Sequence, residues 1–289
     1  MNIILGASGQ VGSAIVDFLI DEGEPVKGVI RDKKKAGKFK EKTAEVSIAN
    51  YFDAEALKPA LKDGDTIFVL TPESPTSEDI MGDTRKLLEN YRSAIESSKV
   101  KKVVGLSSMG AQHSSGTGNL QMSYMLEQAF TDLPVQKVFV RPAYYFSNWL
   151  PYLSMVEEQG VLPTFFPVEL EIPMISPLDV AEFLAKVISD ESTDSKISEV
   201  TGAKTYSSKD IADILSEVLD RDVEAQQIPR STWKVTILQF GFTENTAENL
   251  IEMIEAVIDG KTLPEKEDAV IELPTTFHSY LTGQINGSI

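Results

Sequence analysis

The sequence predicts an α/β protein, with a doubly wound parallel β-sheet followed by a smaller C-terminal α/β lobe. In the first part of the chain, short apolar runs alternate with amphipathic segments, which is typical of β-α-β units joined by right-handed crossovers. Beyond Pro151 this alternation loosens, and prolines punctuate the chain up to Pro177. We therefore expect a first domain at residues 1–145, to which 171–190 return, and an interleaved smaller lobe at 146–289.

The N-terminus has the pattern of a strand, a glycine turn and the start of a helix. A mainly apolar run at residues 1–5 is followed by glycines at positions 6, 9 and 12 and then by apolar residues at helical spacing. Glycines in this context are typical of the dinucleotide-binding turn of Rossmann-type folds, although an ordinary strand-to-helix loop is the alternative. Gly6 would allow the tight turn, Gly9 the approach of a pyrophosphate, and Gly12 the close packing of helix on strand. The predicted cofactor-binding turn comprises Gly6, Ala7, Ser8, Gly9, Gln10, Val11 and Gly12.

Arg31 stands just past the second predicted strand, where ribose selectivity is decided in this fold. An acidic residue there holds the 2'-hydroxyl of NAD, whereas an arginine accommodates the 2'-phosphate of NADP. Residues 31–42 hold seven basic and two acidic side chains, in an otherwise acidic protein. The sequence therefore favours NADP(H) over NAD(H). Asp32 could instead bind the ribose, and a merely solvated run of charges is the other alternative.

Predicted strands and helices continue to alternate along the chain, so the residues that follow the strands lie on one rim of the sheet. Ligands of such sheets bind beyond the carboxyl ends of the strands. Strands are expected at 44–48, 66–70, 103–106 and 135–140, and helices at 54–61, 79–98 and 119–130. Ser-x-x-Asp patterns at 176 and 207 predict two further helix starts. Besides the glycine turn and Arg31, the expected rim comprises Leu70, Thr71, Pro72, Ser107 and Ser108.

The most aromatic stretch of the chain, residues 141–150, follows the sixth predicted strand. Pro142 lacks an amide donor and would direct the chain out of the sheet. The aromatic side chains are then expected in a cleft where a planar ring could stack, although plain core packing is the alternative. The expected substrate cleft contains Phe146, Asn148, Trp149 and, from the Gly- and Ser-rich loop at 109–120, His113.

Composition excludes several classes of function. A formal net charge of -17 argues against broad nucleic-acid binding. With no cysteine and two histidines, the chain has few ligands for a transition metal, and we expect no metal site. No apolar run approaches the roughly 18 residues of a membrane helix, and no charged leader precedes one, so we expect a cytoplasmic protein without a membrane anchor.

Together these motifs resemble the NmrA-like atypical short-chain dehydrogenases, a family that includes NAD(P)H quinone oxidoreductases. The resemblance covers about the first 230 residues and rests on the glycine motif at 6–12, Arg31, Leu-Ser-Ser at 106–108, the arginine-proline-aromatic stretch at 141–149, Ser-Pro-Leu-Asp-Val-Ala at 176–181 and Tyr-Ser-Ser-Lys-Asp-Ile-Ala at 206–212. The glycine motif is shared with nucleotide-sugar epimerases, and the arginine-proline-aromatic stretch is more particular.

The resemblance implies a Rossmann domain that binds NADP(H) and a C-terminal lobe that closes over a substrate cleft. It assigns the pyrophosphate to residues 6–12 and the 2'-phosphate to Arg31. It further assigns the track from adenosine to nicotinamide to residues 70–72 and Ser107, and the nicotinamide end to Tyr144 and Tyr145.

One departure from the superfamily limits the chemistry. Its usual Tyr-x-x-x-Lys pair exchanges a proton with the substrate, and none of the eight tyrosines here has a lysine four residues on. Where many relatives place a lysine, the helix at 119–130 has Tyr124. Ser107 and Ser108 have no histidine in a nucleophile arrangement and are interpreted as hydrogen-bonding groups. Tyr124 and Ser108 are the candidate catalytic residues.

The primary hypothesis is hydride transfer from NADPH to a quinone-like planar acceptor, whose reduced oxygens can take protons from water. An NADP(H)-sensing regulator without catalysis, which would need a protein partner, is the alternative. A nucleotide-sugar epimerase is the third possibility, and the missing Tyr-x-x-x-Lys pair disfavours it.

Overall fold

The computed structural model describes residues 1–40, 45–192 and 194–287, and its largest element is a parallel sheet of eight strands. In spatial order the strands are β13 (Ile271–Leu273), β10 (Lys196–Gly202), β6 (Gln136–Pro142), β5 (Lys102–Leu106), β4 (Thr66–Leu70), β1 (Asn2–Leu5), β2 (Val26–Ile30) and β3 (Glu45–Ile48). The predicted fold class is confirmed. The strand order reverses between β1 and β4, which opens a crevice at their carboxyl ends. Ala44 of the predicted third strand lies outside the described residues.

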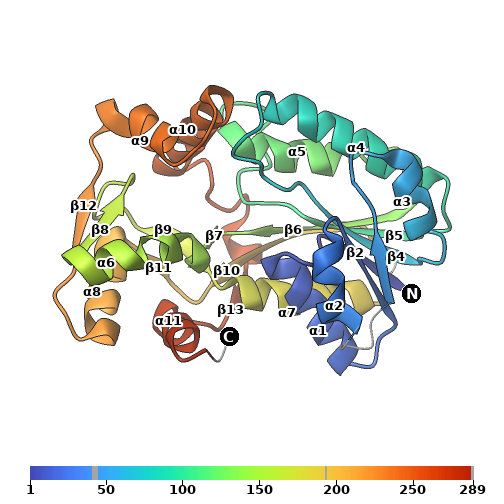
Figure 1. Cartoon of the computed structure of the whole chain (residues 1–289), viewed down its shortest axis with the longest axis horizontal. Helices are drawn as coiled ribbons and strands as arrows, with labels where there is room; N and C mark the ends of the chain where they lie inside the picture. The colour runs from blue at the N-terminus through green and yellow to red at the C-terminus, as the bar shows by residue number, and fades with distance from the viewer. Residues whose placement is uncertain (41–44, 193, 288–289) are drawn as a thin grey trace.

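Helices cover both faces of the sheet (Figure 1). One face carries α3 (Ala54–Ala60), α4 (Ile80–Glu96) and α5 (Gln121–Gln128), and the other carries α1 (Gln10–Asp21), α2 (Ala36–Lys40) and α7 (Pro177–Ser189). Each face has its own apolar core, because strands buried on both sides present side chains alternately to the two layers. The segment that contains α7 comes from the second half of the chain and packs against α1.

The Ser-x-x-Asp patterns begin helices as predicted. Ser176 precedes α7, and its hydroxyl accepts hydrogen bonds from the backbone N–H groups of Leu178 and Asp179. Ser207 and Asp210 form a capping box at the start of α8 (Ser208–Leu219). Each cap satisfies backbone donors that the first helical turn leaves unpaired.

The remaining elements form a smaller lobe beside the carboxyl ends of the strands (Figure 1). It contains a small sheet of β7 (Tyr144–Tyr145), β9 (Ile172–Ile175) and β11 (Thr205–Tyr206), and a strand pair of β8 (Val161–Thr164) and β12 (Glu224–Gln227). Its helices are α6 (Leu153–Gln159), α8, α9 (Trp233–Gln239), α10 (Glu244–Ile258) and α11 (Phe277–Ile285). Within the described residues, no helix is both long and apolar enough to cross a membrane.

Aromatic rings hold the core of this lobe together. The Phe146 ring lies 5.4 Å from Phe277 and 5.7 Å from both Tyr206 and Tyr280, measured between ring centres. Phe146 is fully buried and Trp149 is 3% exposed. Aromatic pairs at these separations contribute beyond the area they bury.

Candidate functional site

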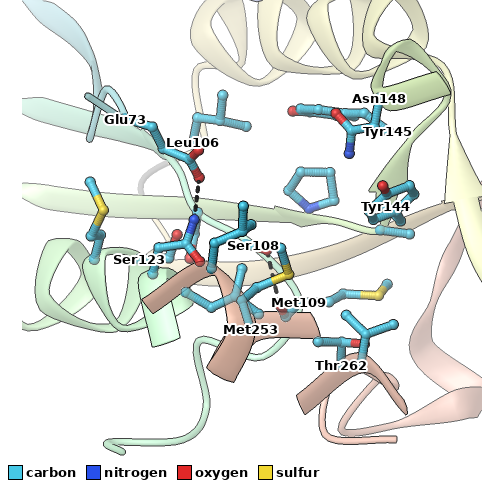
Figure 2. Close-up of a pocket in the computed structure, with 18 of the residues that line it drawn as sticks. Glu73, Leu106, Ser108, Met109, Ser123, Tyr144, Tyr145, Asn148, Met253 and Thr262 are labelled. Carbon is cyan, nitrogen blue, oxygen red and sulfur yellow. Dashed lines mark hydrogen bonds between the residues drawn. The ribbon is translucent and has the colours of Figure 1, made fainter. Parts of the chain in front are cut away.

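A cavity of about 580 Å³ lies between the sheet and the smaller lobe, beyond the carboxyl ends of β4, β5 and β6 (Figure 2). Its floor comes from the strand ends, and its walls come from β7, from α5 with the preceding 3-10 helix η2 (Gly118–Leu120), and from α10. Its lining includes Leu70, Thr71, Glu73, Ser107, Ser108, Asn119, Ser123, Tyr144, Tyr145, Ser147 and Asn148.

The glycine turn joins β1 to α1, and its backbone explains the glycines. Gly6 has a φ of +66°, a left-handed conformation that favours glycine. A Cβ atom on Gly12 would lie 2.3 Å from the Gly6 carbonyl oxygen, so only glycine lets the helix start this close to the strand. Gly9, the residue before α1, has no side chain, so it makes no side-chain hydrogen bond to the N–H groups of the first helical turn. This arrangement fits the pyrophosphate of a dinucleotide.

Tyr51, which the sequence analysis missed, connects the glycine turn to Arg31. Its hydroxyl accepts a hydrogen bond from the Gly6 N–H (2.5 Å) and donates one to the Val29 carbonyl (2.9 Å). The guanidinium carbon of Arg31 lies 5.7 Å from the centre of the Tyr51 ring. Burial raises the pKa of Tyr51, against the lowering effect of the Gly6 N–H and the Arg31 charge. Nothing in the local sequence signals this link, since Tyr51 is 45 residues from Gly6.

Next to Arg31 in the sequence are Asp32 and the rest of the basic segment at 31–42. Arg31 is exposed at the end of β2. The Asp32 carboxylate accepts a hydrogen bond from the Lys34 N–H (2.8 Å) and caps the short helix η1 (Lys33–Lys35). Asp32, the alternative ribose ligand, is therefore engaged by its own turn. The last two residues of the basic segment, 41 and 42, lie outside the described residues.

The aromatic segment divides between the cleft and the core. Tyr144, Tyr145 and Asn148 line the cavity (Figure 2). Phe146 and Trp149 belong to the apolar core of the smaller lobe and are not among the described lining residues, which matches the core-packing alternative. Burial raises the pKa values of Tyr144 and Tyr145 well above that of a free tyrosine. The cleft therefore keeps both phenols neutral at physiological pH.

The two serines after β5, Ser107 and Ser108, line the cavity, and Ser107 is also held by a buried ion pair. Ser107 donates a hydrogen bond to Glu127 Oε1 (2.6 Å), and Glu127 receives two hydrogen bonds from Arg141, each 2.8 Å long. Arg141 and Glu127 are 3% and 5% exposed. Ser108 donates to the Met109 carbonyl (2.9 Å). The arginine of the arginine-proline-aromatic stretch thus fixes the position of Ser107 rather than facing the cleft.

Three predicted site residues are not among the described lining residues of the cavity. Among the described residues, the lining includes Ser123 but not its neighbour Tyr124 on α5, and it includes Leu70 and Thr71 but not Pro72. His113 is partly buried in the loop after β5 and is also outside the described lining. Of the two candidate catalytic residues, the structure brings Ser108 to the cleft.

Glu73 and Asn119 are cleft residues that the sequence analysis did not identify. Glu73 accepts a hydrogen bond from Asn119 Nδ2 (3.0 Å), shown as a dashed line in Figure 2. The Glu73 carboxyl group is open to solvent inside the cavity but is surrounded by protein, and this partial desolvation raises its pKa. The one available signal was the position of Glu73, three residues beyond a strand that ends on the rim.

Comparison with known proteins places this chain in a family. The sequence profile of the NmrA-like family matches residues 2–281. The chain belongs to the NmrA-like family. The predicted resemblance is confirmed, and it extends beyond the first 230 residues on which it rested.

Relatives of this NmrA-like chain include reductases. It is 23% identical to the NAD(P)H azoreductase of Xenophilus azovorans over 88% of this chain and 86% of that protein. It is 22% identical to quinone oxidoreductase 2 of Escherichia coli K12 over 87% of this chain and 86% of that protein. Distant homologues of the chain therefore include NAD(P)H-dependent reductases.

Solved structures share the fold at low identity. A crystal structure of the Escherichia coli NADPH-dependent quinone oxidoreductase with NADPH superposes with a TM-score of 0.84 and 21% identity, covering 99% of this chain and all of that one. A nucleoside-diphosphate-sugar epimerase from Staphylococcus aureus superposes with a TM-score of 0.81 and 22% identity, covering 98% of this chain and 100% of that one. At such identities the likeness concerns the fold, so the choice between reduction and epimerisation depends on the site itself.

Proposed function

We propose that this NmrA-like protein is an NADPH-dependent reductase that transfers a hydride to a planar, uncharged acceptor of the quinone class. The observation that carries the proposal is the cleft itself, which has tyrosines on one wall and contacts the glycine turn. Ser147, on the cleft wall, donates a hydrogen bond to Gln10 of the turn (3.2 Å). A dinucleotide on the turn would therefore have its reactive end directed toward the cavity.

The residues present fit NADP(H). The uncapped first turn of α1 would hold the pyrophosphate, and Arg31, held over Tyr51, would bind the 2'-phosphate. The bound cofactor supplies the hydride, and the protein supplies its orientation and surroundings. Ser107, Thr71 and Tyr145 line the cavity, and in this proposal they would orient the nicotinamide end.

The lining of the cleft supports a quinone rather than a sugar nucleotide. Its volume of about 580 Å³ suits a small molecule. Among the described lining residues none is Lys, Arg or His, so the acceptor site offers no cation for a substrate diphosphate. Tyr-x-x-x-Lys is also missing from the sequence. An uncharged ring that stacks beside Tyr144 and Tyr145 needs neither a cation for a diphosphate nor a Tyr-x-x-x-Lys pair.

The test is a fluorescence titration of wild-type protein and Arg31→Ala with NADPH and NADH, followed by addition of a simple quinone. We expect Arg31→Ala to weaken NADPH binding about 10- to 100-fold, as the loss of hydrogen bonds to a charged group implies, and to leave NADH binding nearly unchanged. Quinone should then consume the bound NADPH.

Two other outcomes would redirect the assignment. Tight NADPH binding without oxidation by any of a broad panel of quinones would favour the NADP(H)-sensing regulator. A search for a protein that associates differently with and without NADPH would then follow. Oxidation that depends on a sugar nucleotide would favour the epimerase instead.

A further inference from the structure

The described lining of the cleft contains one carboxyl group, that of Glu73. The titratable groups among the described lining residues are Glu73, Tyr144 and Tyr145. Burial raises the pKa values of both tyrosines above 10, the ordinary value for a phenol, so they hold their protons throughout the physiological range. Glu73, three residues beyond the end of β4, is thus the side chain of the described lining that could donate a proton to a molecule in this cavity.

Asn119 can stabilise Glu73 in either protonation state. Its Nδ2 donates to Glu73 Oε1 (3.0 Å), as suits a carboxylate. The side chain is 8% exposed, and its Oδ1 is buried without a hydrogen-bond partner among the described residues. Rotation of the amide would present this oxygen to a protonated Glu73 and satisfy it. Asn119 can therefore donate to the carboxylate and, after rotation, accept from the acid form.

Charged groups on the surrounding elements do not shift the pKa of Glu73. On α5, Glu127 is paired with Arg141, and beyond α10 the Lys261 ammonium donates to the Gly116 carbonyl (3.1 Å). The α10 residues that line the cleft are apolar, and His113 lies outside the described lining. Partial desolvation raises the pKa of Glu73 and the Asn119 hydrogen bond lowers it, with no contribution from a charged neighbour.

We propose that Glu73 is the proton donor that completes reduction of the acceptor, a role that rests on the reductase function proposed above. As the acceptor takes a hydride from the reduced nicotinamide, the Glu73 O–H bond breaks and a new O–H bond forms on an acceptor oxygen. The nicotinamide is oxidised, the acceptor gains two electrons and two hydrogens, and the carboxylate recovers its proton from solvent in the cleft mouth. Glu73 thereby replaces the missing tyrosine-lysine pair.

The test compares Glu73→Gln with Glu78→Gln, which removes a similar charge from the same loop at an exposed position. With NADPH and a quinone, we expect the wild-type rate to fall as the pH rises and Glu73 ionises. Glu73→Gln should be slower at low pH by about 10²-fold, the lower end for general acid catalysis, and should lose this pH dependence. Glu78→Gln should follow the wild type, and all three proteins should bind NADPH equally.

A second measurement does not depend on turnover. Infrared spectra of the protein without cofactor should show the carbonyl stretch of a protonated carboxyl that disappears as the pH rises, and Glu73→Gln should lack this band. Wild-type rates in Glu73→Gln at every pH, or a band that survives the substitution, would overturn the role of Glu73 and leave the reductase function standing. A wild-type protein that binds NADPH but reduces no quinone would overturn the function and this role with it.

Discussion

The hydroxyl of Tyr51 accepts a hydrogen bond from the backbone N–H of Gly6, at 2.5 Å, and thereby ties the loop after β3 to the glycine turn. The same hydroxyl donates to Val29, and the ring lies under Arg31. One side chain therefore sets the conformation of the turn that would hold the pyrophosphate and the place of the arginine that would hold the 2'-phosphate. Both the affinity for the cofactor and the selectivity for NADPH over NADH should therefore depend on Tyr51.

Replacement of Tyr51 by Phe should weaken both functions. The ring remains under Arg31, but the Gly6 N–H loses its partner and the Val29 carbonyl keeps only its hydrogen bond from the Ala7 N–H (3.3 Å). We expect a loss of about 1–3 kcal/mol in the free energy of unfolding, the cost of unsatisfied buried groups, and weaker binding of both NADPH and NADH. Urea unfolding and fluorescence titration would measure the two effects. Unchanged affinity for both cofactors would show that the turn keeps its shape without Tyr51.

Replacement of Arg141 by Met should destabilise the protein strongly. Arg141 is buried against Glu127 and Glu199 and also contacts Glu265, so its loss leaves two buried carboxylates without their cation. Breaking a buried ion pair from one side costs about 3–5 kcal/mol. Denaturant midpoints should fall accordingly. Arg92→Met, which removes the exposed bidentate pair with Asp132, is the matched control and should lower the midpoint far less. Equal losses in the two variants would contradict the account.

The parts of this site that sequence reasoning found are those that local backbone geometry dictates. Gly6 and Gly12 are required by a positive φ and a close approach within one turn, and both constraints act over a few residues. The alternation of strands and helices likewise follows from apolar spacing along the chain. The sheet and the glycine turn were therefore predictable.

What sequence reasoning could not find depends on contacts across the fold. Glu73 meets Asn119 across 46 residues, and neither stands in a recognisable motif. The division of the aromatic segment is similar. Tyr144 and Tyr145 pair with β9 and line the cleft, while the next residue, Phe146, turns into the core of the smaller lobe. Only the packed lobe decides which rings face the cavity.

Replacement of Tyr145 by Phe should separate stability from ligand contact. The Tyr145 hydroxyl is buried without a hydrogen-bond partner in the described part of the chain. Its removal should raise the free energy of unfolding of the free protein by about 1 kcal/mol, since an unsatisfied buried polar group is a cost. If the hydroxyl contacts the bound cofactor, the same variant should bind NADPH less tightly. A less stable free protein would show that the hydroxyl has a partner after all.

The buried tyrosines should make the fold sensitive to alkaline pH. Burial raises the pKa values of Tyr51, Tyr91, Tyr144 and Tyr145 in the folded protein, whereas in the unfolded chain they ionise near pH 10. Above that pH the unfolded chain binds fewer protons than the folded one. Stability contributed by these groups is therefore complete below about pH 10 and is lost as the pH rises toward the folded pKa values, by up to about 1.4 kcal/mol per pH unit for each tyrosine.

Urea unfolding at a series of alkaline pH values, with phenolate absorbance recorded alongside, would measure this loss. Tyr145→Phe should reduce the slope by the share of one tyrosine, because the group that ionises on unfolding is gone. A slope that the substitution leaves unchanged would mean that Tyr145 ionises equally well in the folded protein. The cleft would then be more hydrated than its lining implies. At high pH the wall proposed to contact the acceptor would carry the charge of an ionised Tyr145.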